Sequence, residues 1–264
     1  MELFGVMDLP DELDAEITAA ATEWETNALL GRVWFRDSDV WTGHDESRWL
    51  GWLDVPEDPT VVAARLKAFR EQLTKDSIRC VVLLGMGGST LFPDMIRQVF
   101  EAKGDIEFRI LDSTDPAQIR TFESTIDLEH TVFVVSSKSG TTLETRMFYE
   151  YFMSRLEPVL GADVVSSRFC AVTDAGSELD QLAGAKCFRA VFHGDAAVGG
   201  RYSALTYFGM LPAAIIGGDV EWLLTRARSM ADACRPANSA GENPGVRLGL
   251  MLGHAAKAGR NKLT

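Results

Sequence analysis

Seven consecutive residues, Ser136–Thr142, combine five hydroxyl side chains with one lysine and one glycine. They follow an apolar run and precede a helical pattern. At the amino end of a helix, unpaired backbone N–H groups and the helix dipole favour an anion, so this composition predicts a phosphate-binding loop. Thr141 and Glu144 also have the spacing of a capping box. For Glu144, this capping role is favoured over a role as catalytic base. Whether Lys138 contacts a phosphate or solvent stays open.

A glycine-rich turn, Gly85–Thr90, follows another apolar run. Glycines permit a tight turn and a close approach of backbone amides to a ligand, and Ser89 is expected to cap the next helix. Pro93 is expected in the first turn of that helix, where proline is tolerated. A dinucleotide fingerprint matches only in part, because its sixth position is Thr90, although Asp112 ends the next predicted strand as a ribose-binding acid would. A purely structural turn and a nicotinamide-dependent oxidoreductase are the alternatives for this loop.

A third cluster, Gly199–Ser203, places two glycines before Arg201. The glycines let the backbone pass close to a ligand, and the guanidinium can stabilise a developing oxyanion in a site screened from water. An arginine that only begins a helix is the alternative. Asp115 and Pro116 are interpreted as the N-cap and first residue of a helix. No metal site is predicted, because the histidines show no ligand spacing: His44, His130, His193 and His254.

Short apolar runs alternate with helical patterns around these clusters. Such alternation is typical of βαβ units and predicts a parallel sheet, in which ligands bind beyond the carboxyl ends of the strands. The predicted fold class is α/β, a three-layer αβα sandwich with five parallel strands and helices on both faces. The predicted strands are Cys80–Leu84, Glu107–Leu111, Thr131–Ser136, Arg168–Thr173 and Cys187–Val191.

Three segments are expected along the chain. Residues 1–56 are expected to form a helical, aromatic arm that covers another surface, because its tryptophans are scattered among polar residues. Residues 57–200 contain the predicted sheet, beginning with a helix near Thr60–Thr74. Residues 201–264 are expected to be a helical segment that leads towards a second domain. Its predicted helices are Tyr202–Ile216, Val220–Ala233 and Asn243–Gly259.

Composition excludes several classes of protein. A formal net charge of −12 and a pI near 4.8 argue against nucleic acid and acidic membrane surfaces as partners. No stretch approaches the ~18 apolar residues of a membrane span, and the acidic first residues do not resemble a signal peptide. The cysteines are predicted to be buried free thiols. A cytoplasmic location and no cofactor are expected. The cysteines are Cys80, Cys170, Cys187 and Cys234.

Together the motifs resemble those of glucose-6-phosphate isomerases. They are Gly85–Ser89, the run SSKSGTTLET from Ser136 to Thr145, and VGGRYS from Val198 to Ser203, in that order and spacing. With Val40–Thr42 and the tail from Arg247 to Thr264, the chain is most similar to the isomerase module fused behind transaldolase in some bacteria. The resemblance covers nearly the whole chain and implies a sugar-isomerase (SIS) domain. Phe92 departs from the family, which usually has glycine before this proline.

The resemblance also implies roles for individual residues. Arg201 would stabilise the cis-enediolate that forms as a proton moves between C2 and C1 of a hexose 6-phosphate. The glutamate, histidine and lysine that complete the family's site have no match here, so we expect a truncated isomerase that binds weakly and is nearly inactive alone. A non-catalytic sugar-phosphate-binding domain is the alternative, and a homodimer is open. The phosphate would contact Ser137, Lys138, Ser139, Thr141 and Thr142, and the sugar Gly87, Gly88 and Ser89.

Overall fold

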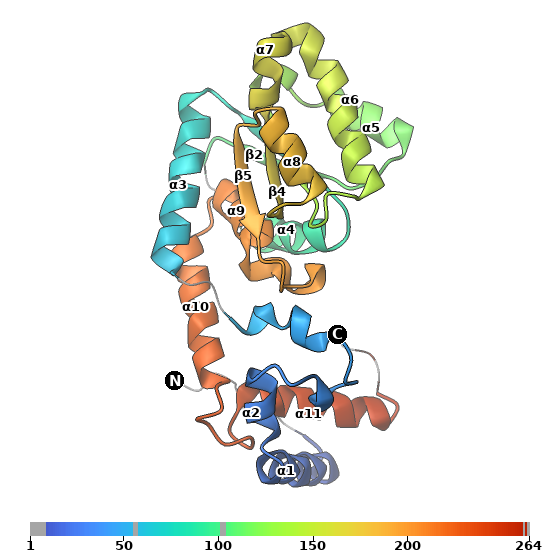
Figure 1. Cartoon of the computed structure of the whole chain (residues 1–264), viewed down its shortest axis with the longest axis vertical. Helices are drawn as coiled ribbons and strands as arrows, with labels where there is room; N and C mark the ends of the chain where they lie inside the picture. Colours follow the sequence, from blue (N-terminus) through green and yellow to red (C-terminus); the bar gives the residue numbers. More distant parts are fainter. Residues whose placement is uncertain (1–8, 55–57, 101–103, 261, 263–264) are drawn as a thin grey trace. The chain divides into compact units, whose positions relative to one another are not determined.

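The computed structural model describes residues 9–54, 58–100, 104–260 and 262 (Figure 1). Contacts within the chain group it into two compact units. One unit contains residues 56–224, including the whole sheet, and the other contains residues 1–55 and 225–264. Helix α10 (Val220–Ala233) contributes residues to both. The predicted domains 1–56, 57–200 and 201–264 stay a prediction.

Five strands form one parallel sheet in the order β2-β1-β3-β4-β5, which confirms the predicted fold class. The fifth strand begins at Ala190 rather than at the predicted Cys187. Cys187 has a φ of +55° and donates its N–H to the Gly184 carbonyl, so it still belongs to the end of the preceding helix. The strands are β1 (Cys80–Gly85), β2 (Glu107–Leu111), β3 (Thr131–Ser136), β4 (Phe169–Asp174) and β5 (Ala190–Gly194).

Helices cover both faces of the sheet (Figure 1). Successive strand residues point to opposite faces, so Val81 and Leu83 pack into one core while Val82 and Leu84 pack into the other. The first core is completed by α3 (Pro59–Lys75), α4 (Gly88–Val99), α9 (Tyr207–Ile216) and the start of α10. The second is completed by α5 (Pro116–Glu123), α6 (Leu143–Leu160), α7 (Ala162–Val165) and α8 (Glu178–Ala185).

The cap predicted for α5 is confirmed. The Asp115 carboxylate accepts the N–H of Gln118 at 2.8 Å, and Pro116 is the first helical residue. This arrangement satisfies one of the N–H groups that a helix leaves unpaired at its start. Pro116 has no N–H to lose at that position.

Two other predicted helix starts are wrong. Helix α4 begins at Gly88, so Ser89 already lies within it and Pro93 lies beyond its first turn. Gly87, with a φ of +55°, makes the turn in place of a side-chain cap. The capping box of Thr141 and Glu144 is not formed, because Thr142 is the N-cap of α6 and no side chain caps it.

The predicted helix Tyr202–Ile216 is divided in the structure. A 3-10 helix, Gly200–Leu205, comes first, and α9 follows. Thr206 between them has extended backbone, with φ −96° and ψ −176°, and its hydroxyl caps α9 by accepting the N–H of Phe208. The break leaves Arg201 on a short 3-10 turn.

The other unit contains helices of both ends of the chain. Ala21 of α1 and Val246 of α11 share a small buried cluster. Trp34 donates its indole N–H to the Cys234 carbonyl at 3.1 Å. Phe35, in contrast, is 88% exposed. The elements are α1 (Asp11–Thr26), α2 (Leu29–Trp34), α11 (Pro244–Lys257) and 3-10 helices at Ser38–Val40, Glu46–Trp49 and Gly51–Leu53.

The cysteines are free, as predicted, but only two of them are buried. Burial raises the pKa of the Cys80 and Cys170 thiols to about 12. The prediction of burial is wrong for Cys187, which is exposed, and for Cys234, which is half-buried. Among the described residues, no helix is both long and apolar enough to cross a membrane.

Candidate functional site

The carboxyl ends of β1 and β3 are neighbours in the sheet. Gly85 pairs with Ser136 in the register, so the glycine loop (Gly85–Thr90) and the hydroxyl loop (Ser136–Thr142) leave the sheet side by side. Chain connections run outward in opposite directions from these two strands, β1 to β2 and β3 to β4. Open parallel sheets bind ligands at such a switch point. The fold therefore brings the two predicted loops to the place where a ligand is expected.

The hydroxyl groups of the hydroxyl loop fix its backbone. Ser137 Oγ donates to Thr142 Oγ1 at 3.0 Å and accepts the N–H of Gly140 at 3.1 Å. Ser139 Oγ accepts the N–H of Thr141 at 3.2 Å, and the hydroxyls of these two residues lie 2.7 Å apart. Ser137 is buried, while Ser139 and Thr141 are exposed. The loop thus has a defined shape and presents two hydroxyls to solvent.

Several N–H groups at this end of the sheet have no acceptor within the part of the chain that the structure describes. Those of Lys138, Ser139 and Thr142 donate to none of the described residues. The first-turn N–H groups of α6 have no acceptor within their own helix. Because α6 has 18 residues, its dipole adds a positive end to these donors. This combination is suited to an anion such as phosphate.

Gly140 closes the hydroxyl loop against the first turn of α8. Its φ is +74°, in the left-handed region that favours glycine. A Cβ built on Gly140 would lie 2.3 Å from the backbone nitrogen of Leu179, closer than any side chain can pack. Any side chain at this position would therefore force the loop away from α8.

Lys138 is held by protein groups. Its Nζ donates to Asp174 Oδ2 at 2.6 Å and to the carbonyl of Asp195 at 2.7 Å. Asp174 is the last residue of β4, and Asp195 directly follows β5. The sequence analysis considered only phosphate and solvent as partners of Lys138. The structure shows a third partner, the carboxylate of Asp174. Asp174 is the residue of this site that the sequence analysis missed, although its place at the end of a predicted strand was a usable signal.

The glycine loop lies directly against the start of the 3-10 helix that carries Arg201. A Cβ on Gly88 would lie 2.7 Å from the carbonyl oxygen of Gly200, so only glycine allows this approach. Arg201 is exposed, and no described residue bonds to its guanidinium. Gly87 is exposed, and Ser89 is half-buried. The structure therefore joins the glycine loop and the Arg201 cluster through backbone contact.

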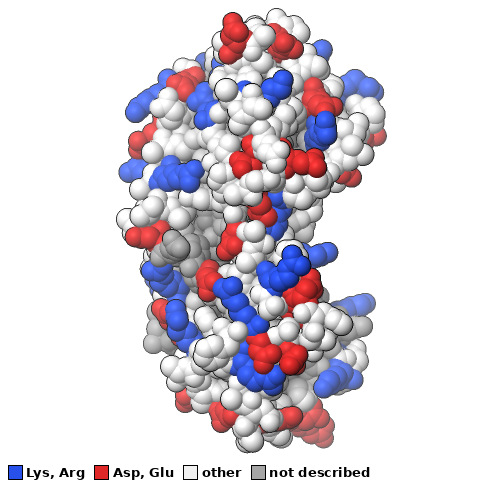
Figure 2. Space-filling view, in the orientation of Figure 1, with Lys and Arg blue, Asp and Glu red and all other residues white. Residues whose placement is uncertain are grey.

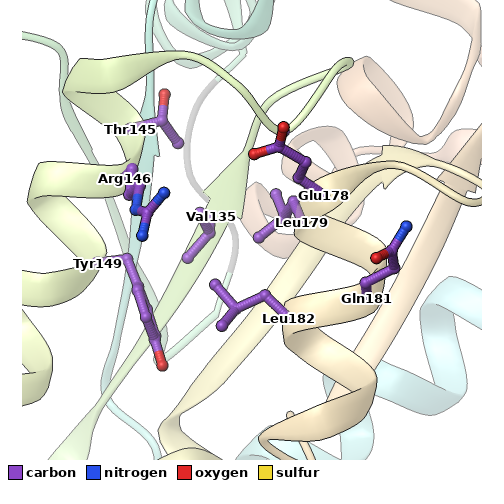
Figure 3. Close-up of a pocket in the computed structure, with 9 residues that line it drawn as sticks. Val135, Thr145, Arg146, Tyr149, Glu178, Leu179, Gln181 and Leu182 are labelled. Atoms are coloured by element: carbon purple, nitrogen blue, oxygen red, sulfur yellow. The ribbon is translucent and has the colours of Figure 1, made fainter.

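A pocket of about 280 Å³ lies between α6 and α8 (Figure 3). Val135, Leu179 and Leu182 contribute apolar side chains to it, while Arg146 and Glu178 stand on opposite walls. Gly140 also lines this pocket, but the glycine loop and Arg201 do not. The pocket is therefore next to the hydroxyl loop and separate from the place where the three sequence clusters predict a sugar.

The sequence profile of the family described as phosphoglucose isomerase matches residues 55–253. The chain belongs to the phosphoglucose isomerase family. A glucose-6-phosphate isomerase of Thermus thermophilus is 36% identical over 184 residues, which cover 68% of this chain and 42% of the relative. The enzyme of the same name from Acaryochloris marina is 30% identical, over 95% of this chain and 47% of its own length. The chain therefore spans less than half of these family members.

Solved structures agree with the family assignment. A Thermus thermophilus protein described as hypothetical superposes with a TM-score of 0.77 and 28% identity, covering 94% of this chain and 57% of its own. A glucose-6-phosphate isomerase of Chlamydia trachomatis superposes with a TM-score of 0.63 and 25% identity, covering 97% of this chain and 44% of its own. The similarity in structure thus extends over almost all of the chain.

Charges on the surface of this family member are mixed. Figure 2 shows acidic and basic side chains interspersed over the visible face. The chain has a net charge of −12, so the electrostatic field of the whole protein does not attract a phosphate, and binding one would require local donors. The N–H groups of the hydroxyl loop are such donors.

Proposed function

We propose that the sheet unit binds a hexose 6-phosphate and serves the interconversion of glucose 6-phosphate and fructose 6-phosphate through a cis-enediol. The observation that carries the proposal is the meeting of the hydroxyl loop and the glycine loop at the switch point of the sheet, in a member of the phosphoglucose isomerase family. The names of its relatives support this substrate, since the curated relatives described above are glucose-6-phosphate isomerases.

The phosphate is proposed to bind at the hydroxyl loop. The exposed hydroxyls of Ser139 and Thr141 and the unpaired N–H groups of the loop would donate to its oxygens. Ser137 and Thr142 bond to each other and would hold the loop in shape as well as bordering the site. Lys138 would contribute positive charge from its place beside Asp174.

The sugar is proposed to lie along Gly87, Gly88 and Ser89. The exposed guanidinium of Arg201 would stabilise the enediolate oxygen, because its charge is fixed and needs no protonation step. Proton transfer between C2 and C1 requires a base within hydrogen-bond reach of the carbon-bound proton. We propose that a residue outside these 264 supplies it, and that this chain alone turns over substrate slowly or not at all. A cytoplasmic location remains part of the proposal, while a homodimer and a transaldolase fusion stay open.

Calorimetric titration with glucose 6-phosphate, with glucose as the control ligand, tests the binding step. Wild type is expected to bind the phosphate ester and not glucose. Ser139→Ala is expected to weaken binding by about three- to tenfold through the loss of one hydrogen bond to a charged group. Ser154→Ala, an exposed serine on α6, is the matched control. Absence of binding by wild type would reject the proposal.

A non-catalytic sugar-phosphate-binding domain is the second candidate. One feature of the resemblance favours this binding domain: no residue of this chain matches the family's proton-transferring glutamate. Turnover of fructose 6-phosphate separates the two candidates. We expect a chain extended at its carboxyl end to the length of the curated relatives to be active. Binding without turnover in that longer chain would support the binding domain and contradict the isomerase.

A further inference from the structure

The end of β4 holds Lys138 by both its backbone and its side chain. The Lys138 carbonyl accepts the N–H of Asp174 at 3.1 Å and the hydroxyl of Thr173 at 3.2 Å. The Lys138 ammonium donates to the Asp174 carboxylate at 2.6 Å. These three bonds connect one residue of the hydroxyl loop to two consecutive strand residues. They form a clamp, which we call the Lys138 clamp.

The clamp is largely shielded from water. Side-chain exposure is 22% for Lys138 and 18% for Asp174. The other carboxylate oxygen, Asp174 Oδ1, is buried and has no hydrogen-bond partner among the described residues. Burying a carboxylate is costly unless a positive charge lies next to it, so Asp174 depends on the Lys138 ammonium.

Strand β5 passes close to the Asp174 carboxylate at its last residue, Gly194. A Cβ on Gly194 would lie 3.0 Å from Asp174 Oδ1 and 2.7 Å from the ring of Phe208. The glycine thus lets β5 close over the clamp. The Asp195 carbonyl that follows accepts a second hydrogen bond from Lys138 Nζ at 2.7 Å. An ammonium has three donors, so one remains for a ligand.

We propose that Asp174 is a positioning residue for phosphate binding: it fixes Lys138, and through Lys138 the backbone of the hydroxyl loop. This inference rests on the proposed function. It assigns the carboxylate a supporting role, although a negative charge so close to a phosphate site would by itself repel the ligand. The alternative is that Asp174 competes with phosphate for Lys138.

The two roles predict opposite effects of Asp174→Asn on affinity for glucose 6-phosphate. If Asp174 positions Lys138, the variant binds more weakly, by about tenfold, because loop and ammonium lose their anchor. If Asp174 competes with the ligand, the variant binds more tightly. Equal or tighter binding by Asp174→Asn, with wild-type binding intact, overturns the inference and leaves the proposed function standing.

A double-mutant cycle tests whether Asp174 acts through the lysine. In the Lys138→Met background, Asp174→Asn is expected to change the affinity by less than about twofold, whereas a general structural defect would persist there. Asp174→Glu keeps the charge and is expected to restore part of the affinity. Asp180→Asn is the matched control, since it removes a carboxylate of α8 that is paired with His193 of β5. The affinity of Asp180→Asn for glucose 6-phosphate is expected to equal that of wild type.

Two outcomes complete the test. If Asp174→Asn does not fold, Thr173→Val removes one bond of the clamp, together with the bond between the hydroxyls of Thr173 and Ser177, and leaves the charges of the clamp in place; it is expected to weaken binding about threefold. Unchanged binding by this variant contradicts the inference. If wild type itself does not bind glucose 6-phosphate, the proposed function fails first, and the role of the clamp in binding falls with it.

Discussion

The shape of the hydroxyl loop depends on a glycine, Gly140. Its left-handed backbone and its contact with the Leu179 backbone both exclude a side chain. Ser137 accepts the Gly140 N–H, so the same residue also anchors the hydroxyl network. A substitution of Gly140 is therefore expected to disturb the backbone conformation of the loop, its packing against α8 and the proposed phosphate site together.

Gly140→Ala is expected to lower the free energy of unfolding by about 2–4 kcal/mol, since it combines left-handed strain with a steric overlap. Gly184→Ala is the matched control, because Gly184 is an exposed helical glycine with no atom near a built Cβ. Its stability is expected to rise by up to about 1 kcal/mol. Urea denaturation measures both. Equal stability of Gly140→Ala and wild type would contradict the loop geometry.

At the scale of elements, an ion pair connects the end of α3 to the start of β5. Arg189, just before β5, donates to the carboxylate of Asp76, the C-cap residue of α3, at 2.5 Å. The hydrogen bond from Arg189 lowers the pKa of Asp76 below its ordinary value of 3.8. A group whose pKa is lower in the folded protein stabilises that state above its unfolded pKa. The stabilisation is lost as pH falls through the folded pKa.

Asp76→Asn is therefore expected to reduce stability at about pH 6 and to matter progressively less below pH 3.8. The free energy of unfolding, measured by urea denaturation across this range, should show the wild type and variant converging at acid pH. Arg189→Gln removes the other partner and also the hydrogen bond from Arg189 Nε to the Ser167 carbonyl at 2.8 Å, so its difference from wild type should narrow at acid pH without closing. A difference that stays constant with pH would mean that the ion pair is not its cause.

At the scale of the whole molecule, two units have separate buried clusters. The sheet unit contains both large cores, and the other unit contains a small cluster that includes Ala21 and Val246. The tryptophans are unevenly divided between the units, which gives each a different spectroscopic signal. Trp24, Trp34, Trp41, Trp49 and Trp52 belong to residues 1–55, and Trp222 belongs to the sheet unit.

Tryptophan fluorescence and far-ultraviolet circular dichroism are expected to give different unfolding midpoints, because fluorescence reports mainly on one unit. Trp222→Phe should remove the contribution of the sheet unit and leave the fluorescence midpoint unchanged. Glucose 6-phosphate should raise only the midpoint of the sheet unit, since a ligand stabilises the unit that binds it. Coincident transitions by both probes would show that the units unfold together.

The strands and the three chemical clusters were predictable because their signals are local. Each buried strand is a short apolar run, and the hydroxyl loop, the glycine loop and Arg201 each follow from residue types at close spacing. The helix starts were harder. Ser89 and Glu144 are residue types that cap helices, but α4 begins after a glycine turn at Gly87 and α6 begins after Thr142 without a side-chain cap.

The sequence by itself determined the sheet and its five strands, and it predicted the loops that we propose contact a phosphate. Tertiary structure decided which distant groups meet: Gly88 with Gly200, and Lys138 with Asp174. Those pairs lie on different strands or loops, so no periodicity along the chain encodes their contact. Parallel pairing of β3 with β4 brings Lys138 to Asp174, and packing of α4 against the 3-10 helix Gly200–Leu205 brings Gly88 to Gly200. The burial that follows makes the Asp174 carboxylate depend on the Lys138 ammonium.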